Sequence, residues 1–187
     1  MASLTKTSYV ILGMLALGMR TGYDIKALVD VSTRCFWAAS YGQIYPELQR
    51  LEQAGLVRGE PDPQDGRRRK LYELTPAGER ALREWIAADA PLHLELRHEG
   101  LLKFFFADAV GPEERVELLR RMRTVHEAEA DRLRRIAESA RAKQAERGKR
   151  MPALTAEFGV AYNDFIVEWC SRMEQELQAE AHEVAGR

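Results

Sequence analysis

Residues 40–57 read "SYGQIYPELQRLEQAGLV", and the architecture of the chain can be worked out from this segment. The apolar residues recur at the period of a helix and share one face, which consists of Ile44, Leu48 and Leu51. Ser40 and Gln43 have the S-x-x-Q spacing of a capping box, which predicts that the helix begins at Ser40. Gly55 supplies the end of the helix. The segment therefore predicts one amphipathic helix.

The opposite face of this helix is polar but carries little charge, and it contains a proline. Its members are Gly42, Gln43, Pro46, Gln49, Arg50 and Gln53, with Tyr41 and Tyr45 at the margin. Pro46 lacks an N–H and crowds the carbonyl of Gly42, so we expect the first turn to be kinked. Gly42 adds no side chain to that turn. Such a surface can approach a DNA groove closely, and we interpret it as a reading surface.

The neighbouring segments complete a known order of elements. Upstream, residues 4–17 predict one helix that closes at Gly18, and Thr21 caps a second. Downstream, residues 56–61 and 69–74 predict two short strands separated by the turn-rich "DPQDG". Thr75 and Pro76 then begin another helix. Three helices, two strands and a helix form a winged helix-turn-helix, which we assign to residues 1–90 as a DNA-binding domain.

Residues 91–187 predict helices only, and we assign them to a dimerisation domain. We expect one helix over residues 96–110, a second over 112–149 and a third after Pro152. The second has a narrow apolar stripe of Val116, Leu119, Met122, Leu133, Ile136 and Ala140. The third has a thicker one of Leu154, Phe158, Tyr162, Phe165, Trp169, Met173 and Leu177. These stripes favour pairing of helices between subunits. A monomeric three-helix bundle is the alternative. The expected fold class is mainly α with a small β-hairpin.

Composition excludes several other classes of protein. The chain has 187 residues, a net charge of −1 and no apolar run long enough for a membrane span. The first residues lack a secretion signal, so we expect a cytoplasmic protein. Cys35 and Cys170 lie too far apart to suggest a disulfide framework, and the histidines show no metal-ligand spacing. No phosphate loop or nucleophile motif appears. We expect no metal, no cofactor and no enzymatic activity.

A basic run, "RRRK", lies in the predicted hairpin at Arg67, Arg68, Arg69 and Lys70. Such a run alone is most often a solvated surface. Beside a groove-reading helix, it is better suited to gripping phosphate.

Together these features define the candidate DNA contacts. They are Ser40, Tyr41, Gln43, Tyr45, Gln49, Arg50, Arg67, Arg68, Arg69 and Lys70. Glutamines can bond base edges, tyrosines can reach phosphates, and Arg50 can do either. Two alternatives remain open. Ser40 can be a helix cap alone or also a phosphate ligand, and Tyr45 can pad the edge of the core.

The pattern S-x-G-x-I-Y-P-x-L-x-x-L-E-x-x-G-L, the basic wing and "YELTPAGERAL" at residues 72–82 closely resemble the PadR family of bacterial transcriptional regulators. The resemblance covers the first half of the chain, together with "YVILGMLALGMRTGYDIKALV" at residues 9–29. The second half looks like the longer helical type of the virulence-regulator-like subgroup. Tyr41 and Gln43 depart from many relatives, which carry proline and a small hydroxyl residue there. The resemblance implies a homodimeric repressor that binds a palindromic operator and responds to a small ligand.

An effector pocket is a separate hypothesis. It rests on aromatic surface that the helices do not need for one apolar face, and its candidate residues are Trp37, Trp85, Phe104, Phe105 and Trp169. The alternative is that these side chains only pack the junction and the dimer interface. A redox role of Cys35 is weakly supported, because no resolving cysteine is visible in the sequence. For the whole chain, the alternative to a DNA-binding regulator is a winged-helix protein–protein adaptor.

Overall fold

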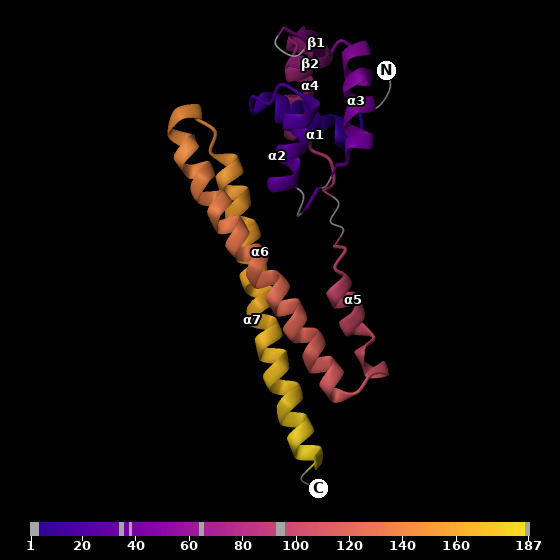
Figure 1. The fold of residues 1–187 in the computed structure, drawn as a ribbon, viewed down its shortest axis with the longest axis vertical. Coiled ribbons are helices and arrows are strands. Elements are labelled where there is room, and N and C mark those ends of the chain that lie inside the picture. The colour runs from indigo at the N-terminus through magenta and orange to yellow at the C-terminus, as the bar shows by residue number, and fades with distance from the viewer. Residues whose placement is uncertain (1–3, 34–35, 38, 64–65, 93–95, 186–187) are drawn as a thin grey trace. The chain divides into compact units, whose positions relative to one another are not determined.

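The computed structural model describes residues 4–33, 36–37, 39–63, 66–92 and 96–185, and at 66–68, 145–147 and 180–185 it describes the backbone only. The chain forms two compact units, Met1–Leu92 and His93–Arg187, each with its own packing. Figure 1 shows the elements of both. Within the described residues, no helix has the length and apolar character needed to cross a bilayer. Each unit is described by itself below.

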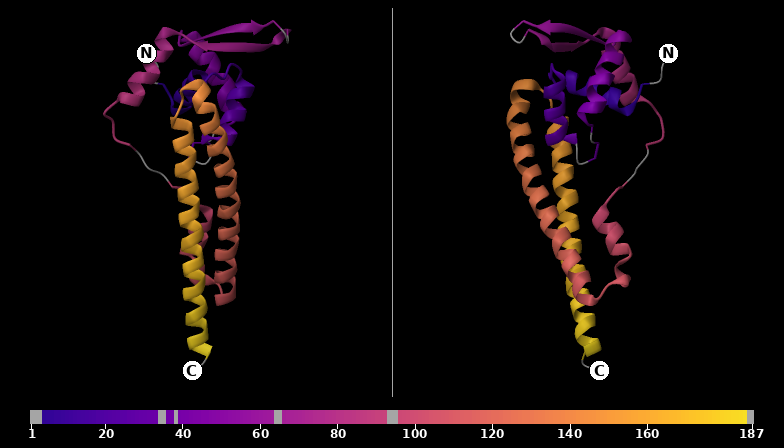
Figure 2. Two further views of the ribbon diagram at one scale, coloured as in Figure 1. Left: turned by 90° about the vertical axis from the view of Figure 1, so that its left-hand side faces the viewer. Right: turned by 45° about the vertical axis from the view of Figure 1, so that its right-hand side comes forward.

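The first unit is a winged helix-turn-helix, as the sequence predicts. Its elements are α1 (Lys6–Ala16), α2 (Gly22–Val31), α3 (Tyr41–Gln53), β1 (Val57–Asp62), β2 (Gly66–Leu74) and α4 (Pro76–Ala87). The two strands pair antiparallel from Val57 opposite Leu74 to Asp62 opposite Gly66, with an irregularity after Pro61. The hairpin projects from the helices as a wing (Figure 2). β1 has the predicted length but lies one residue further along the chain, and β2 is longer than predicted because it begins already at Gly66, which pairs with Asp62.

The helices of this unit begin and end where local chemistry predicts. Thr21 and Thr75 cap α2 and α4 through their side chains, and Pro76 occupies the first turn of α4. Gly18 and Gly55 follow the ends of α1 and α3 with φ of 97° and 69°, a conformation that glycine adopts without steric cost. The predicted start of α3 after Ser40 is confirmed.

One apolar core holds the first unit together. Its largest fully buried members are Ile11, Leu12, Ile25, Val29, Ile44, Leu48 and Leu51, contributed by α1, α2 and α3. Val57 and Tyr72 extend this core into the wing. The backbone N–H of Tyr72 also donates to the Arg20 carbonyl at 2.7 Å, which attaches the wing to the α1–α2 connection. One side of α3 is thus fixed in the core, and its other side stays exposed.

The second unit contains α5 (Glu99–Phe105), the 3-10 turn η2 (Ala107–Ala109), α6 (Pro112–Arg147) and α7 (Met151–Ala185). The predicted single helix over residues 96–110 is wrong. The helix begins only at Glu99, because the His98 ring caps it by accepting from the Leu101 N–H. At its other end the Nε–H of Arg115 donates to the Ala107 carbonyl at 2.9 Å, so the chain turns before α6.

Helices α6 and α7 run antiparallel as a long pair (Figures 1 and 2). Leu119 of α6 is buried in an apolar cluster with Met122 of the same helix and Ile166 and Cys170 of α7. Leu133 of α6 is buried against Gly159 of α7. Four residues of the predicted apolar stripe of α6 are thus buried within this unit, namely Val116, Leu119, Met122 and Leu133, and Ile136 and Ala140 are partly buried. The thicker stripe of α7 divides in two. One part packs against the buried cluster around Leu119 and Cys170 and consists of Tyr162, Trp169, Met173 and Leu177. The other part is exposed and consists of Leu154, Phe158 and Phe165.

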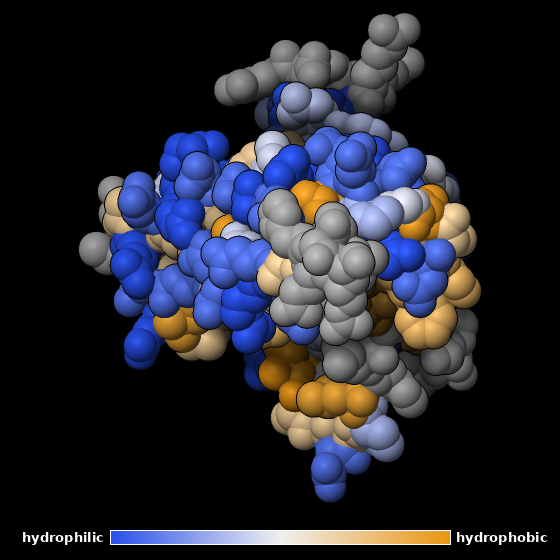
Figure 3. All heavy atoms as spheres, turned by 90° about the horizontal axis from the view of Figure 1, so that it is seen from below, coloured by the Kyte–Doolittle hydropathy of each residue, from blue (hydrophilic) through white to orange (hydrophobic). Residues whose placement is uncertain are grey.

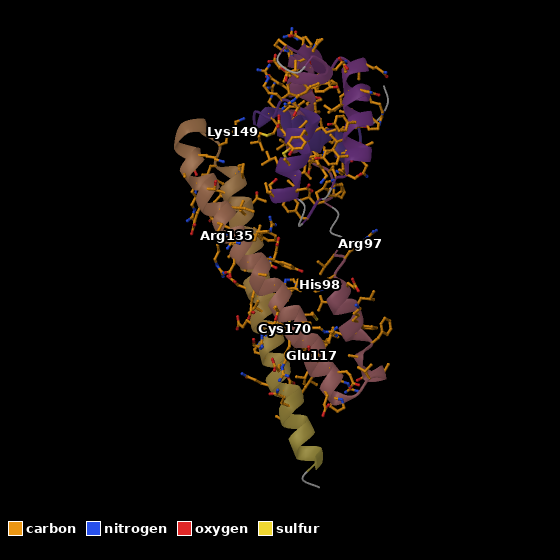
Figure 4. The ribbon with its side chains drawn as sticks, in the orientation of Figure 1. Arg97, His98, Glu117, Arg135, Lys149 and Cys170 are labelled. Carbon is orange, nitrogen blue, oxygen red and sulfur yellow. The ribbon has the colours of Figure 1, made fainter. Side chains whose placement is uncertain are left out.

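A chain of hydrogen bonds joins α5, α6 and α7 around two histidines. His98 lies at the start of α5 (Figure 4). Its Nε2 is 2.9 Å from Nε2 of His126, and Nδ1 of His126 is 2.6 Å from Oδ1 of Asn163. The Asn163 amide donates to the Gly159 carbonyl at 2.7 Å. Because Nδ1 of His98 already accepts from Leu101, every bond is satisfied when both rings are neutral and His98 carries its proton on Nε2.

This arrangement predicts a loss of stability in mild acid. Burial, and then the neighbouring His126, lower the pKa of His98 below its ordinary value of 6.5. The unfolded chain therefore takes up this proton first, so the stabilisation is fully present above about pH 6.5 and is lost as pH falls towards the depressed pKa. NMR titration of the ring protons should give His98 a pKa below 6.5. A value of 6.5 or more would contradict the hydrogen-bond assignment. His98→Asn keeps a helix cap and should flatten the pH dependence.

Candidate nucleic-acid interface

The candidate DNA contacts on α3 share its exposed side. Ile44, Leu48 and Leu51 are buried, whereas Ser40, Tyr41, Gln43, Tyr45, Gln49 and Arg50 are all exposed. Pro46 lies on the same exposed side. The amphipathic division predicted for this helix is therefore present, and the face offered to solvent carries one arginine as its only cation among the residues of α3.

The two tyrosines of this face are held in position by α2. Their rings stack on each other with centroids 6.2 Å apart, and the Lys26 ammonium lies 5.3 Å from the Tyr41 centroid. A Cβ at Gly22 would come within 2.7 Å of the Tyr45 ring, so only glycine lets that ring lie on α2. Tyr45 thus covers the edge of the helix pair while almost half of it stays exposed, at 46%. Both of its predicted uses, padding and contact, are compatible with this geometry.

Gln43 has a structural task as well as an exposed position. Its Oε1 accepts from the Ser40 N–H at 3.0 Å and from the Ser40 hydroxyl at 3.2 Å. This is the return bond of the capping box. A hydrogen bond from Gln43 to a base would therefore come from its Nε2 donor.

Glu47 is a buried carboxylate in the middle of α3, and the sequence interpretation missed it. It is only 7% exposed. One carboxylate oxygen accepts hydrogen bonds from the hydroxyls of Ser8 and Thr5 at the N-terminus of α1. The other oxygen accepts from Nη1 of Arg50 at 2.7 Å. The signal was present, because Glu47 falls on the apolar face between Ile44 and Leu51, where a charge needs buried partners.

The basic run lies on β2, and the side chains of Arg67 and Arg68 lie outside the part that the structure describes. Arg69 has Nε 3.7 Å from an oxygen of Asp62, and Nη2 3.9 Å from Asp24. Lys70 pairs with both oxygens of Glu52 on α3, at 3.1 and 3.2 Å. Two of the four cations are thus already opposite carboxylates.

The Lys70–Glu52 pair connects the wing to α3. The hydrogen bond from Lys70 to Glu52, followed by their charge attraction, raises the pKa of the Lys70 ammonium above 10.5. Lys70 therefore stays charged over the ordinary pH range. Half of its side chain remains exposed, and a phosphate could compete for it because an exposed pair of this kind is weak.

The predicted effector residues are divided between the two units. In the first unit, Trp85 stacks on Tyr9 with centroids 4.5 Å apart, under the Lys6 ammonium, and Trp37 is exposed at 43%. In the second unit, Phe104 and Trp169 meet edge to face at 5.2 Å, and Phe105 is 79% exposed. Cys35 and His93 lie outside the described residues. Among those described, no three His, Cys, Asp or Glu side chains gather in a way that would hold a metal.

Two shallow hollows of about 280 and 340 Å³ lie between α6 and α7. They are lined mainly by charged side chains such as Arg141 and Glu157, and none of the predicted aromatic residues lines either one. Cys170 is buried beside this helix contact, and its burial raises the pKa of its thiol (Figure 4). A reactive thiolate at Cys170 is therefore disfavoured.

Comparison with known proteins gives two family matches that follow each other along the chain. Residues 11–84 match the transcriptional regulator PadR-like family, and residues 96–178 match the virulence activator alpha C-terminal family. The negative transcriptional regulator PadR of Bacillus subtilis is 32% identical over 113 residues, which are 60% of this chain and 62% of that protein. The match thus spans less than two thirds of that relative's length.

Solved structures show the same fold over almost the whole chain. The PadR-like regulator BC1756 of Bacillus cereus superposes with a TM-score of 0.79 at 24% identity, over 94% of this chain and 99% of that one. B. subtilis PadR, solved in complex with operator DNA and with p-coumaric acid, gives TM-scores of 0.78 and 0.72 at 24% identity, over 91% of this chain and 98% of that one. The Vibrio cholerae virulence activator AphA gives 0.69 at 25% identity, over 94% and 99%. A PadR-like winged helix followed by a virulence-activator-type helical region places this chain in the PadR family of transcriptional regulators.

Proposed function

We propose that this protein is a homodimeric, sequence-specific DNA-binding regulator, a repressor that acts in the cytoplasm on a palindromic operator. The observation that carries the proposal is the exposed face of α3. It offers hydrogen-bonding side chains at its N-terminal half while its opposite face is fixed in the core. Recognition helices use these N-terminal residues to contact base edges in the major groove. The B. subtilis relative, solved with operator DNA, supports the same use of the fold.

The wing supplies the complementary contacts. The cations Arg67, Arg68, Arg69 and Lys70 follow one another on β2, and Lys70 bonds to Glu52 of α3. Phosphate contacts fix the position of a protein on the duplex without reading sequence, whereas base-edge contacts give specificity. In this proposal α3 contacts base edges and the wing contacts phosphates.

In vitro selection from a randomised DNA library tests the proposal. A dimer with two reading helices should enrich a palindrome whose half-sites lie about 34 Å apart, one helical turn. Enrichment of no sequence would favour the alternative function, a protein–protein adaptor that does not read DNA. The basic run alone does not decide between the two functions, because Lys70 also has a structural partner in Glu52. The selection experiment is therefore needed to separate them.

The exposed part of the α7 stripe supports a homodimer. Phe158 and Phe165 are 67% and 57% exposed, and their spacing places them on one helix face. Figure 3 shows hydrophobic residues exposed among hydrophilic ones. Light scattering at micromolar concentration should give about twice the chain mass of 21.3 kDa.

Replacing Phe158 and Phe165 with glutamate should dissociate that dimer, because two charges would be buried in an apolar contact. Ile86→Glu is the control, since Ile86 is equally exposed, at 69%, but lies on α4. A wild-type chain that stays monomeric would remove the homodimer from the account.

We also propose a small planar effector that binds near Phe104 and Trp169 and releases the DNA. The edge-to-face pair of these residues, and the p-coumaric acid bound to the B. subtilis relative, support this proposal. Such a compound should quench tryptophan emission and weaken operator binding over the same concentration range. Trp169→Phe should abolish the quenching while it keeps an aromatic ring. Quenching without a change in DNA affinity would indicate nonspecific apolar binding.

A further inference from the structure

Glu47 lies at the centre of a hydrogen-bonded cluster that joins the start of α1 to the reading helix. Thr5 caps α1, and its N–H donates to the Ser8 hydroxyl oxygen at 2.8 Å. The Ser8 hydroxyl then donates to Oε1 of Glu47, and the Thr5 hydroxyl donates to the same oxygen at 3.3 Å. Ser8 is fully buried. The carboxylate therefore lies at the N-terminal end of α1.

The second carboxylate oxygen of Glu47 points the other way along the cluster, to Arg50. Nη1 of Arg50 donates to Oε2 at 2.7 Å, although half of the Arg50 side chain, 49%, is exposed. A guanidinium has five N–H donors in a planar fork, so one bond to Glu47 leaves other donors for a base or a phosphate. The buried carboxylate thus restrains a side chain that would otherwise sample many rotamers in solvent.

This geometry has two consequences for DNA. The restraint holds the guanidinium plane in one orientation, as bidentate contact with a base requires. The negative charge of Glu47 also opposes the attraction of Arg50 to any nearby phosphate. Both effects favour a directional contact over a nonspecific one.

We infer that Glu47 is a positioning residue for DNA reading: through its bond to Nη1 it orients Arg50 on α3 and so raises the discrimination between operator and other DNA. The inference rests on the proposed function. Glu47 itself, buried between α1 and α3, contacts no DNA and acts through Arg50. A purely structural role, in which Glu47 only attaches α3 to α1, would instead affect operator and random DNA equally.

The test compares wild type and Glu47→Gln in titrations with the selected operator and with a random duplex at 0.1 M salt. Glutamine keeps the volume and an acceptor for Ser8 but removes the charge. We expect affinity for random DNA to rise, by up to about eightfold, the worth of one phosphate contact at this salt. The ratio of operator to random affinity should fall by about five- to tenfold, as expected for coupled neighbours.

A double-mutant cycle with Arg50→Gln identifies the route. In the Arg50→Gln background, Glu47→Gln should change the ratio by less than about twofold, because the residue it acts through is gone. Glu79→Gln is the matched control, since it removes the same charge from an exposed pair with Arg83 on α4, and it should leave the ratio unchanged. If Glu47→Gln does not fold, Glu47→Asp serves instead, because the shorter carboxylate keeps the charge but withdraws from Arg50.

The outcomes separate this inference from the function on which it rests. A wild-type protein that does not discriminate between the two duplexes overturns both. A discriminating wild type with an unchanged ratio in Glu47→Gln overturns only the role of Glu47. The same holds if operator and random affinity fall equally, or if the effect persists without Arg50.

Discussion

Replacing Arg67, Arg68 and Arg69 together with alanine is expected to weaken binding to operator and random DNA by the same factor. Cations that contact phosphates release counterions whatever the base sequence is. The slope of log affinity against log salt should shrink by about 0.9 for each phosphate that the variant no longer neutralises. At 0.1 M salt this corresponds to about eightfold for one phosphate and roughly 500-fold for three. Arg69 lies opposite Asp62 and Asp24, so a phosphate must compete with these carboxylates for it.

The control must remove three positive charges elsewhere. Arg121, Arg135 and Lys143 are exposed on α6 and suit this purpose. Their replacement should leave the salt slope unchanged if the wing acts by contact rather than by bulk charge. A triple wing variant with full affinity and an unchanged slope would show that the wing does not touch DNA, and the adaptor function would then gain support.

Replacing Arg50 or Gln43 should have the opposite signature. If either residue contacts a base, its removal should lower the ratio of specific to nonspecific binding by about 1–3 kcal/mol, with a smaller effect on random DNA. Titrations of Arg50→Gln and Gln43→Ala against both duplexes measure this ratio. Arg80→Gln, a change on exposed α4, is the control. An unchanged ratio in both variants would exclude base contacts by these side chains.

The structure adds a requirement to this second experiment. Removing Arg50 leaves the buried Glu47 carboxylate without its cation, which costs stability even though Arg50 is exposed. Gln43→Ala removes the return bond to the Ser40 N–H and weakens the start of α3. Thermal melts followed by circular dichroism must therefore accompany the titrations, and binding should be compared well below the midpoint of unfolding.

Local patterns predicted the winged helix well because short-range chemistry determines it. The spacing of Ser40 and Gln43, the Thr75–Pro76 pair and the glycines at 18 and 55 each act within one turn of chain. The alternation of buried and exposed residues along α3 depends only on helix geometry. In each of these features, the residues that contact one another in the structure are also close together in the sequence.

The missed features depend on residues far apart in the chain. The partners of Glu47 at the start of α1 lie 39 and 42 positions away, and Lys70 meets Glu52 across 18 positions. No periodicity identifies such partners in advance. The burial of Leu119 and Leu133 of α6 within the unit was not predicted for the same reason, since an apolar stripe shows that a helix must be covered but not by which partner. The prediction of one helix over residues 96–110 was wrong because histidine is not a typical capping residue. His98 acts as one here, and the contact of its ring with His126, 28 positions away, holds it in place.

The most direct test of the claim that α3 reads DNA is an equilibrium titration of the wild-type protein. Fluorescently labelled DNA that carries the sequence enriched from the randomised library is compared with a duplex of the same composition in shuffled order, over a series of salt concentrations. We predict affinity for the enriched DNA at least about a thousandfold above that for the shuffled duplex at physiological salt. Equal affinity for the two duplexes, or no binding to either, would contradict the account.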